Sequence, residues 1–354
     1  MKRLVFILFI LPAIGYSQLK DDKLISNLDS VEYDLTPKTF APSDIRLPFK
    51  RIEIIDARFD TSKLGFDLHR RFVHADFKDF LKIKLTGGVK TAIQQFYNEY
   101  YKLCFTDSSN ELLMVLKTLW INDLPNRHFL EGIRYDIIRE SYKDIYTRVE
   151  YYLRKGSDYY PLKRIDTVYQ LTEQNLHSDD LKFKKHDLSF FMFSIKSLIE
   201  SCDFDELVMG AALKRKLSIQ NIDSFNTSRF ILPILDVLIP QKGVFMSFKE
   251  FANNAPSVNE YNYRITKKGK MEIRGDSISD HFYFAFADTS GLHVQPSKKP
   301  NMIRIGHTFE FIVLAEAPLP MSVGGNILSM SGRGKKVILV DVPRQINMET
   351  GEIY

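Results

Sequence analysis

The amino-acid sequence predicts an α+β fold, in which an antiparallel-rich sheet with helices on one face is followed by a small mainly-β domain. Apolar residues recur at helical spacing over 89–103 and over 188–202, which predicts two amphipathic helices. Residues 145–171 alternate like two strands around a Lys-Gly-Ser-Asp turn, which predicts an antiparallel hairpin. Beyond Pro256 the pattern contains strand signals alone. A chain of 354 residues, 44% of them apolar, is long enough for two domains.

The first domain is predicted to span residues 49–217. The continuous apolar run within 111–121 predicts a buried strand, whereas the polar and aromatic stretch 60–78 indicates a loop. Residues 218–240 are less regular and are assigned to a junction. In chain order the predicted elements are strands at 49–57 and 81–85, a helix at 89–103, a strand at 111–121, a helix near 130–142, strands at 145–153 and 159–171, and helices at 188–202 and 205–217.

The second domain is predicted to span residues 241–354 and to begin with a short helix. Ser247 and Glu250 have the spacing of a capping box, in which the Ser hydroxyl accepts a hydrogen bond from the third helical amide. Asn253 and Pro256 end this helix. The remaining pattern predicts strands at 261–265, 271–273, 282–287, 292–295, 302–305, 308–314 and 337–342, separated by breaks rich in glycine and proline.

The N-terminus has the pattern of a secretory signal. Lys2 and Arg3 precede an apolar run, 4–14, that is shorter than the roughly 20 residues a membrane helix needs. Small residues then mark residues 1–17 as a signal peptide cleaved before Gln18, and residues 18–48 form an extended leader. Because position 18 is not cysteine, the product is expected to be unlipidated. The alternative is an uncleaved N-terminal anchor. No other segment predicts a transmembrane span, so the mature chain is expected to be periplasmic or secreted.

Composition and motifs exclude several classes of function. Without Lys2 and Arg3, 47 basic residues face 44 acidic residues, and the two signs are interspersed, so no nucleic-acid partner is predicted. The Gly87-Gly88 turn lacks the Gly-Lys-Ser/Thr ending of a phosphate-binding loop. It indicates only that glycine allows the backbone to turn before the helix begins. Neither a nucleophile elbow nor a cofactor motif occurs, so no cofactor is predicted.

Three groups of residues are candidates for function. Asp56 and Arg58 alternate at a strand end, so they are expected either to pair as a local salt bridge or to leave Arg58 to bind a ligand carboxylate. Two further groups have alternatives of the same kind. Three histidines, His281, His293 and His307, either form an open zinc site or stand separately at strand edges and turns. Two cysteines, Cys104 and Cys202, either form a disulfide or remain two free thiols.

Two stretches resemble known classes of protein. The sequence Ile54-Ile55-Asp56-Ala57-Arg58-Phe59-Asp60, followed by Leu64-Gly65, resembles the opening of ABC-transport auxiliary lipoproteins over about residues 49–200, although the lipid-bearing cysteine of that family has no counterpart here. Residues 242–257 and the closing 349–354 resemble an uncharacterised class of exported proteins of the Bacteroidota. The second resemblance implies a Gram-negative cell envelope and no particular activity.

The leading hypothesis is therefore a non-catalytic exported protein of the cell envelope that binds a protein, glycan or lipid. The alternative is a hydrolase of envelope polymers that uses carboxylates or the three histidines of the zinc hypothesis. A third class, a structural subunit of an envelope complex, predicts an exposed apolar patch.

Overall fold

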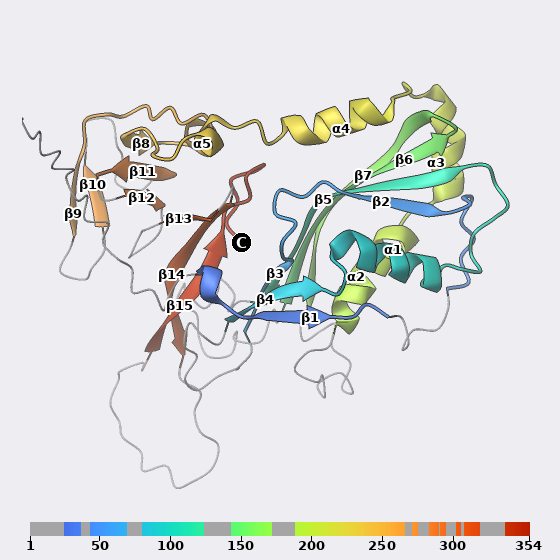
Figure 1. Cartoon of the computed structure of the whole chain (residues 1–354), viewed down its shortest axis with the longest axis horizontal. Coiled ribbons are helices and arrows are strands. Elements are labelled where there is room, and N and C mark those ends of the chain that lie inside the picture. Colours follow the sequence, from blue (N-terminus) through green and yellow to red (C-terminus); the bar gives the residue numbers. More distant parts are fainter. Residues whose placement is uncertain are drawn as a thin grey trace, which may run out of the picture.

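The computed structural model describes residues 25–36, 43–68, 80–123, 143–171, 188–265, 271–274, 283–289, 291–294, 302–305, 308–318 and 337–354. These residues form a mixed α/β structure with a large, mostly antiparallel sheet, six α-helices and three smaller sheets (Figure 1). The predicted helix near 130–142 and the signal peptide lie outside the described residues.

Seven strands form the large sheet, in the order β1-β4-β3-β5-β6-β7, with β2 also paired to β5. Its three longest strands, β5 to β7, pair antiparallel, and β6 and β7 form the predicted hairpin. The predicted loop contains one short strand, β3, which sequence patterning missed because four residues carry too little periodicity. The strands are β1 Ser30–Tyr33, β2 Ile52–Asp56, β3 Gly65–Leu68, β4 Phe80–Leu85, β5 Glu111–Asp123, β6 Lys143–Lys155 and β7 Asp158–Leu171.

Strand β5 has β6 along one edge and two shorter strands along the other. β2 pairs with Leu112–Leu116 and β3 with Ile121–Asp123, so residues 117–120 face the connecting segment 57–64 instead of a strand. A β-bulge between Leu116 and Thr118 lies at this position. The bulge lets Leu116 and Leu119 face the same core although they are three residues apart.

Helices α1, α2 and α3 cover one face of the sheet, where they share the main core with alternate residues of β5. The Tyr97 hydroxyl of α1 donates to the Ile195 carbonyl of α2 at 2.7 Å, and the Tyr151 hydroxyl of β6 donates to the Leu198 carbonyl at 2.8 Å. The buried hydroxyls therefore fix the helices to one another and to the sheet. The helices are α1 Val89–Tyr100, α2 Ser189–Glu200 and α3 Phe204–Gly210, and short 3₁₀ turns follow at Ala211–Leu213 and precede β1 at Ile25–Asn27.

Helix α4, Ile219–Ser228, lies on the opposite face of the sheet, so the expectation of helices on one face only holds for α1 to α3 and is wrong for α4. Its Ile222 packs against Leu113 and Val115 of β5, which point away from the main core. A capping box starts the helix: Ser218 Oγ accepts from the Asn221 amide, and Asn221 Oδ1 accepts from the Ser218 amide. Residues 218–240, expected to be irregular, thus contain α4 and the short α5, Pro233–Asp236.

The C-terminal part is mainly β and agrees with the predicted strands. Its core brings together residues of α5, α6 and the small sheets. Ser247 caps α6 as predicted, since its Oγ accepts from the Glu250 amide, while the Glu250 carboxylate accepts from the Met246 amide. The elements are β8 Gly243–Phe245, α6 Phe248–Ala252, β9 Asn262–Ile265, β10 Met271–Arg274, β11 Ala285–Asp288, β12 Gly291–Val294, β13 Met302–Ile305, β14 Thr308–Pro318 and β15 Val337–Gln345, in sheets β10-β9, β12-β11-β8 and β13-β14-β15. Within the described residues, no helix combines the length and apolar character needed to cross a membrane.

The close approach of β3 to β5 requires glycine at position 65. Gly65 has a φ of +145°, and a Cβ there would lie 1.9 Å from the Ile121 carbonyl oxygen. We expect Gly65→Ala to lower the free energy of unfolding by roughly 3 kcal/mol or more, because β3 has to separate from β5. Urea denaturation measures this change. Gly156→Ala is the matched control: its φ is also positive, at +61°, but a Cβ there meets no atom within 4 Å, so about 1 kcal/mol is expected. Equal losses in the two variants would contradict the close packing.

Candidate functional site

Arg58 fills the gap beside β5. Its Nε and Nη2 donate to the two carboxylate oxygens of Asp56 at 2.8 and 2.9 Å, which is the bidentate pairing expected from the sequence. Its Nη1 donates to the carbonyls of Lys63 and Leu119 at 2.9 and 3.4 Å. The Arg58 side chain is buried, so its guanidinium replaces the hydrogen bonds that the interrupted strand ladder leaves unmade. These contacts support the first of the two alternatives for Arg58, which is a local salt bridge with Asp56.

Lys63 lies buried between two carboxylates in the segment that follows. Its ammonium pairs with Asp60 at 2.5 Å and with Glu310 of β14. The rings of Phe66 and Trp120 lie 5.7 and 5.8 Å from its Nζ. Burial raises the pKa of Asp60, but the Lys63 charge and hydrogen bonds outweigh it and lower the pKa below its ordinary value of 3.8. The cluster ties segment 57–64 to the C-terminal part.

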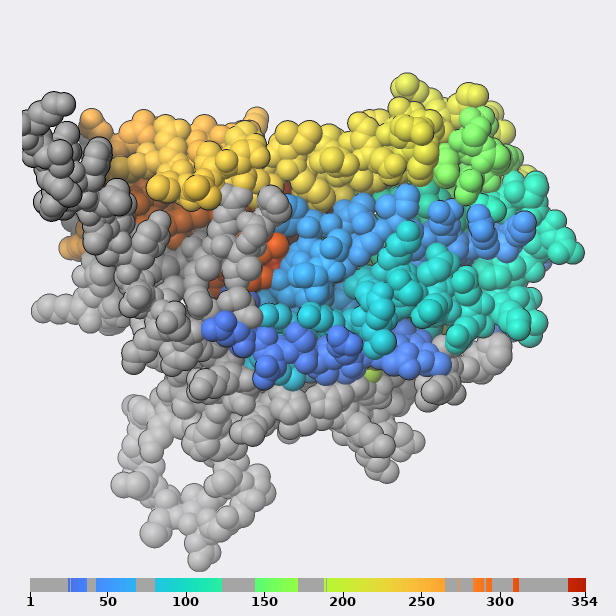
Figure 2. Space-filling view, viewed as in Figure 1, coloured from blue at the N-terminus to red at the C-terminus, as the bar shows by residue number. Residues whose placement is uncertain are grey.

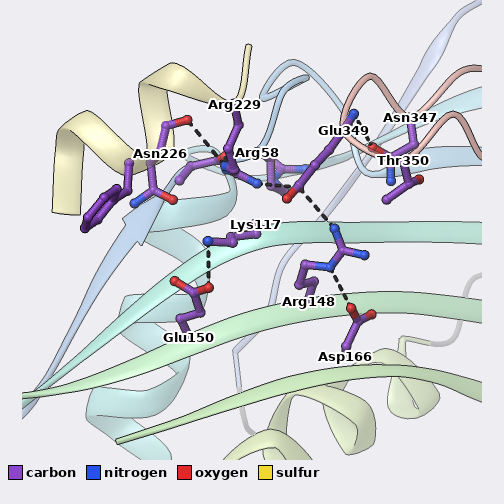
Figure 3. Close-up of polar contacts among 12 residues, drawn as sticks. Arg58, Lys117, Arg148, Glu150, Asp166, Asn226, Arg229, Asn347, Glu349 and Thr350 are labelled. Carbon is purple, nitrogen blue, oxygen red and sulfur yellow. Dashed lines mark hydrogen bonds and ion pairs between the residues drawn. The ribbon is translucent and has the colours of Figure 1, made fainter. Parts of the chain in front are cut away.

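A second set of ion pairs connects the C-terminal segment to the sheet and to α4 (Figure 3). The Glu349 carboxylate pairs with Arg229, at the end of α4, at 2.5 Å and with Arg148 of β6 at 3.2 Å. Arg148 continues to Asp166 of β7 at 2.8 Å. Arg229 also donates to the Ala57 carbonyl at 2.6 Å. One carboxylate therefore joins three elements that are far apart in the sequence.

The bulge of β5 places one further cation beside the gap. Lys117 pairs with Glu150 of β6 at 2.6 Å (Figure 3). The Tyr152 hydroxyl donates to the same carboxylate at 2.7 Å. Burial raises the pKa of Glu150, but the bonds from Lys117 and Tyr152 lower it overall. The Glu150 carboxylate is therefore charged at neutral pH, and its contacts with Lys117 and Tyr152 offset the cost of burying it.

Residues 345–354, the C-terminal segment, close the gap from the other side. The rings of Trp120 and Tyr354 stack with their centres 5.4 Å apart and an interplanar angle of 22°. Asn347 Nδ2 donates to the Tyr354 hydroxyl at 2.5 Å, and Gln345 and Tyr354 exchange two backbone hydrogen bonds. The segment is thereby held against the face of β5 that carries Trp120.

A small, half-open pocket lies where the gap, the bulge and the C-terminal segment meet. Its volume is about 40 Å³, enough for a few waters or one small chemical group. Four side chains of its wall are partly exposed and meet an entering molecule first, namely Phe59, Lys117, Thr118 and Asn347. The wall consists of Arg58, Phe59, Asp60, Lys117, Thr118, Leu119, Trp120, Gln345, Ile346, Asn347, Met348 and Tyr354.

Two buried polar atoms in the pocket wall have no hydrogen-bond partner among the described residues. They are Trp120 Nε1, a donor, and Gln345 Oε1, an acceptor. A buried polar group without a partner costs about 1–3 kcal/mol. Both residues line the pocket, but the two atoms are almost fully shielded, so a group in the pocket reaches them only after a small shift of the side chains.

The predicted histidine group is described only in part. His293 of β12 is buried; its ring stacks on Phe286 with centres 4.3 Å apart, and its Nε2 lies 3.4 Å from Asp288 Oδ1. His281 and His307 lie outside the described residues. Within the part of the chain that the structure describes, no three His, Cys, Asp or Glu side chains gather to hold a metal. The zinc site formed by the three histidines stays a prediction.

The two cysteines are free thiols in the structure. Cys104 Sγ donates to the Ser43 carbonyl at 3.1 Å, and Cys202 Sγ donates to the Leu198 carbonyl at 3.6 Å. Burial raises the pKa of both thiols, so neither is activated as a nucleophile. The structure thus agrees with the second alternative for this pair.

Sequence reasoning found Asp56 and Arg58 but missed Lys63, Glu310 and Glu349. The two found residues are two positions apart at the end of β2, and their pairing follows from local geometry. Lys63 and Glu310 are 247 positions apart, so no spacing rule relates them. The signal that was available was the run of alternating charges at 56–60, which continues to Lys63.

No protein-family profile matches this chain, and neither a curated protein nor a solved structure matches it.

Removal of the Lys63 charge is expected to destabilise the protein in a manner that depends on pH. Lys63→Met leaves Asp60 and Glu310 buried without their cation, which costs about 3–5 kcal/mol at neutral pH. In the wild type the lowered pKa means that Asp60 contributes stability above pH 3.8, and this contribution is lost as the pH falls through the folded-state pKa. The difference between the two proteins should therefore shrink as the pH falls below 3.8, towards about pH 3. Urea denaturation at both pH values measures it.

The control for this substitution is Lys216→Met. Lys216 pairs with Asp158 at 3.2 Å on the surface, where both side chains are exposed, so a change of less than about 0.5 kcal/mol is expected. A Lys63→Met variant that loses no more stability than this control would show that the buried cluster does not hold the segment.

Proposed function

We propose that the protein is exported to the cell envelope by its N-terminal signal and that it binds a partner or ligand there without catalysis. The binding site is the pocket between β5 and the C-terminal segment. The mature chain begins at Gln18 and acts in the periplasm or outside the cell. Its partner is an envelope protein, glycan or lipid that presents a small polar group to the pocket.

The observation that carries the proposal is the unmet donor and acceptor of the pocket wall. A group with one hydrogen-bond acceptor and one donor, such as a secondary amide, complements Trp120 Nε1 and Gln345 Oε1 once a small shift of these two side chains brings the atoms to the pocket surface. The aromatic rings of Phe59 and Tyr354 supply apolar contact beside them. The ion pairs of Lys117 and Glu349 fix the elements on either side of the pocket, which favours binding because only side chains have to move.

The export part of the proposal is tested by the N-terminus of the protein in a Gram-negative host. The periplasmic fraction or the medium should contain a chain that begins at Gln18, because residues 1–17 are removed during export. Fractionation followed by intact-mass analysis measures this. A chain that begins at Met1 and stays in the cytosol would refute export while leaving the binding test untouched.

The binding part is tested by cross-linking in intact cells. A photoreactive amino acid replaces Thr118, whose side chain is partly exposed in the pocket. Irradiation should give a discrete adduct with an envelope component, identified by mass spectrometry. The same amino acid at Val168, an exposed position on β7, is the matched control and should give no such adduct.

Adducts of equal yield at Thr118 and Val168 would contradict the pocket as the binding site. Occlusion supplies a second check: Thr118→Arg fills the pocket, so the fluorescence of Trp120, the single tryptophan of the chain, should no longer respond to the identified partner. A response that survives in this variant would also contradict the proposal.

A further inference from the structure

An exposed row of large apolar side chains lies far from the pocket in the sequence and on different elements. Ten large hydrophobic residues are exposed in the described part of the chain, and six of them fall between positions 209 and 239. The residues of this segment, coloured yellow, form a continuous ridge along one long edge of the molecule (Figure 2). We name these six residues the apolar ridge: Met209, Leu213, Phe225, Ile231, Leu238 and Ile239.

The side chains of the ridge project from the surface instead of lining a groove. Leu213 is 92% exposed at the turn after α3, and Leu238 is 96% exposed in the turn between α5 and β8. Protein interfaces centre on tryptophan, tyrosine and arginine in fitted pockets, whereas this ridge consists of five aliphatic side chains and one phenylalanine. Projecting aliphatic side chains of this kind suit insertion into the boundary between lipid headgroups and acyl chains.

The charge along the same segment favours an anionic surface. Residues 209–242 contain five basic and two acidic residues. Arg229 is held by Glu349, whereas Lys214, Arg215 and Lys216 are exposed directly after Leu213. The Lys214 ammonium also donates to the Leu162 carbonyl at 2.8 Å, and Lys216 pairs with Asp158 on the surface at 3.2 Å, so Arg215 is the cation that this proposal depends on most. Lysine and arginine next to inserted apolar residues add about 1 kcal/mol each to binding at a negatively charged membrane.

We propose that the apolar ridge docks this protein onto the surface of an anionic lipid bilayer. The tips of the ridge enter the headgroup region, and the basic triplet after Leu213 lies over the lipid phosphates. This docking goes beyond the binding proposed for the pocket and uses none of its residues. Docking of this kind holds the protein on the surface of a membrane and needs no helix that spans the bilayer.

Tryptophan placed in the ridge reports directly on this contact. Leu238→Trp should show a blue shift of emission and quenching by brominated acyl chains on addition of vesicles made from equal parts of phosphatidylglycerol and phosphatidylcholine. Trp120 is buried and contributes the same background to every variant. Leu103→Trp is the matched control, because Leu103 is 83% exposed but lies outside the ridge, and its emission should not change. The comparison of the two positions separates ridge contact from any attachment through the N-terminal apolar run.

Two substitutions test the chemistry of the contact. Leu213→Ser combined with Ile239→Ser should weaken vesicle binding of the Leu238→Trp protein at least about tenfold, because two large apolar side chains no longer leave water. Arg215→Glu should weaken it about fivefold or more on the mixed vesicles and have little effect on phosphatidylcholine alone. All three positions are exposed, so the fold should be retained.

An unchanged emission of Leu238→Trp with vesicles would overturn the proposal, as would equal shifts at positions 238 and 103. A blue shift that grows with protein concentration in the absence of lipid would overturn it in favour of a contact between two copies of the chain. A shift that requires the cross-linked partner of the pocket instead of lipid would overturn it in favour of a protein interface. Failure of the pocket cross-linking leaves this lipid test unaffected.

Discussion

Strand β5 carries apolar side chains on both faces between Leu112 and Leu116, and water has to be excluded from each face. On one face α1, α2 and α3 supply the cover, and on the other face Ile222 of α4 packs against Leu113 and Val115. Further along the strand, beyond the bulge, Trp120 is covered by Tyr354 of the C-terminal segment. The second half of the chain therefore supplies the residues that cover this face of β5.

The pocket lies where the neighbours of β5 leave part of that strand uncovered. β2 and β3 share one edge of β5 without meeting, and Arg58 fills the interval with hydrogen bonds to backbone carbonyls. The bulge releases Lys117 from the regular alternation, and Glu349 anchors the C-terminal segment through Arg148 and Arg229. Each interruption is stabilised by charges that neutralise one another. The space that remains between them is small, walled by aromatic rings and open on one side, which is why a compact polar group is its expected occupant.

The sequence predicted those features that depend on neighbours along the chain. The β6–β7 hairpin, helix α1 and the Ser247 cap follow from residue spacings of two to four, and Asp56 with Arg58 belongs to the same category. Helix α4 was missed because its buried face carries Ile222 and Asn226, which make a weak apolar stripe, while Phe225 is exposed. Glu310 and Glu349 lie 247 and 120 positions from their partners Lys63 and Arg229, and only the folded topology brings them together. Residue spacings along the chain therefore predicted most helices and strands but not the candidate site.

Hydrogen exchange in an Ile222→Ala variant tests most directly whether the two-sided burial of β5 organises the molecule. Peptides from α4, from β5 and from residues 345–354 should lose protection together, because the cavity at Ile222 uncovers the face that they share. Phe225→Ala, on the exposed side of the same helix, should leave all three unchanged. Faster exchange confined to α4, with β5 and the C-terminal segment as protected as in the wild type, would show that the burial of β5 does not organise the molecule.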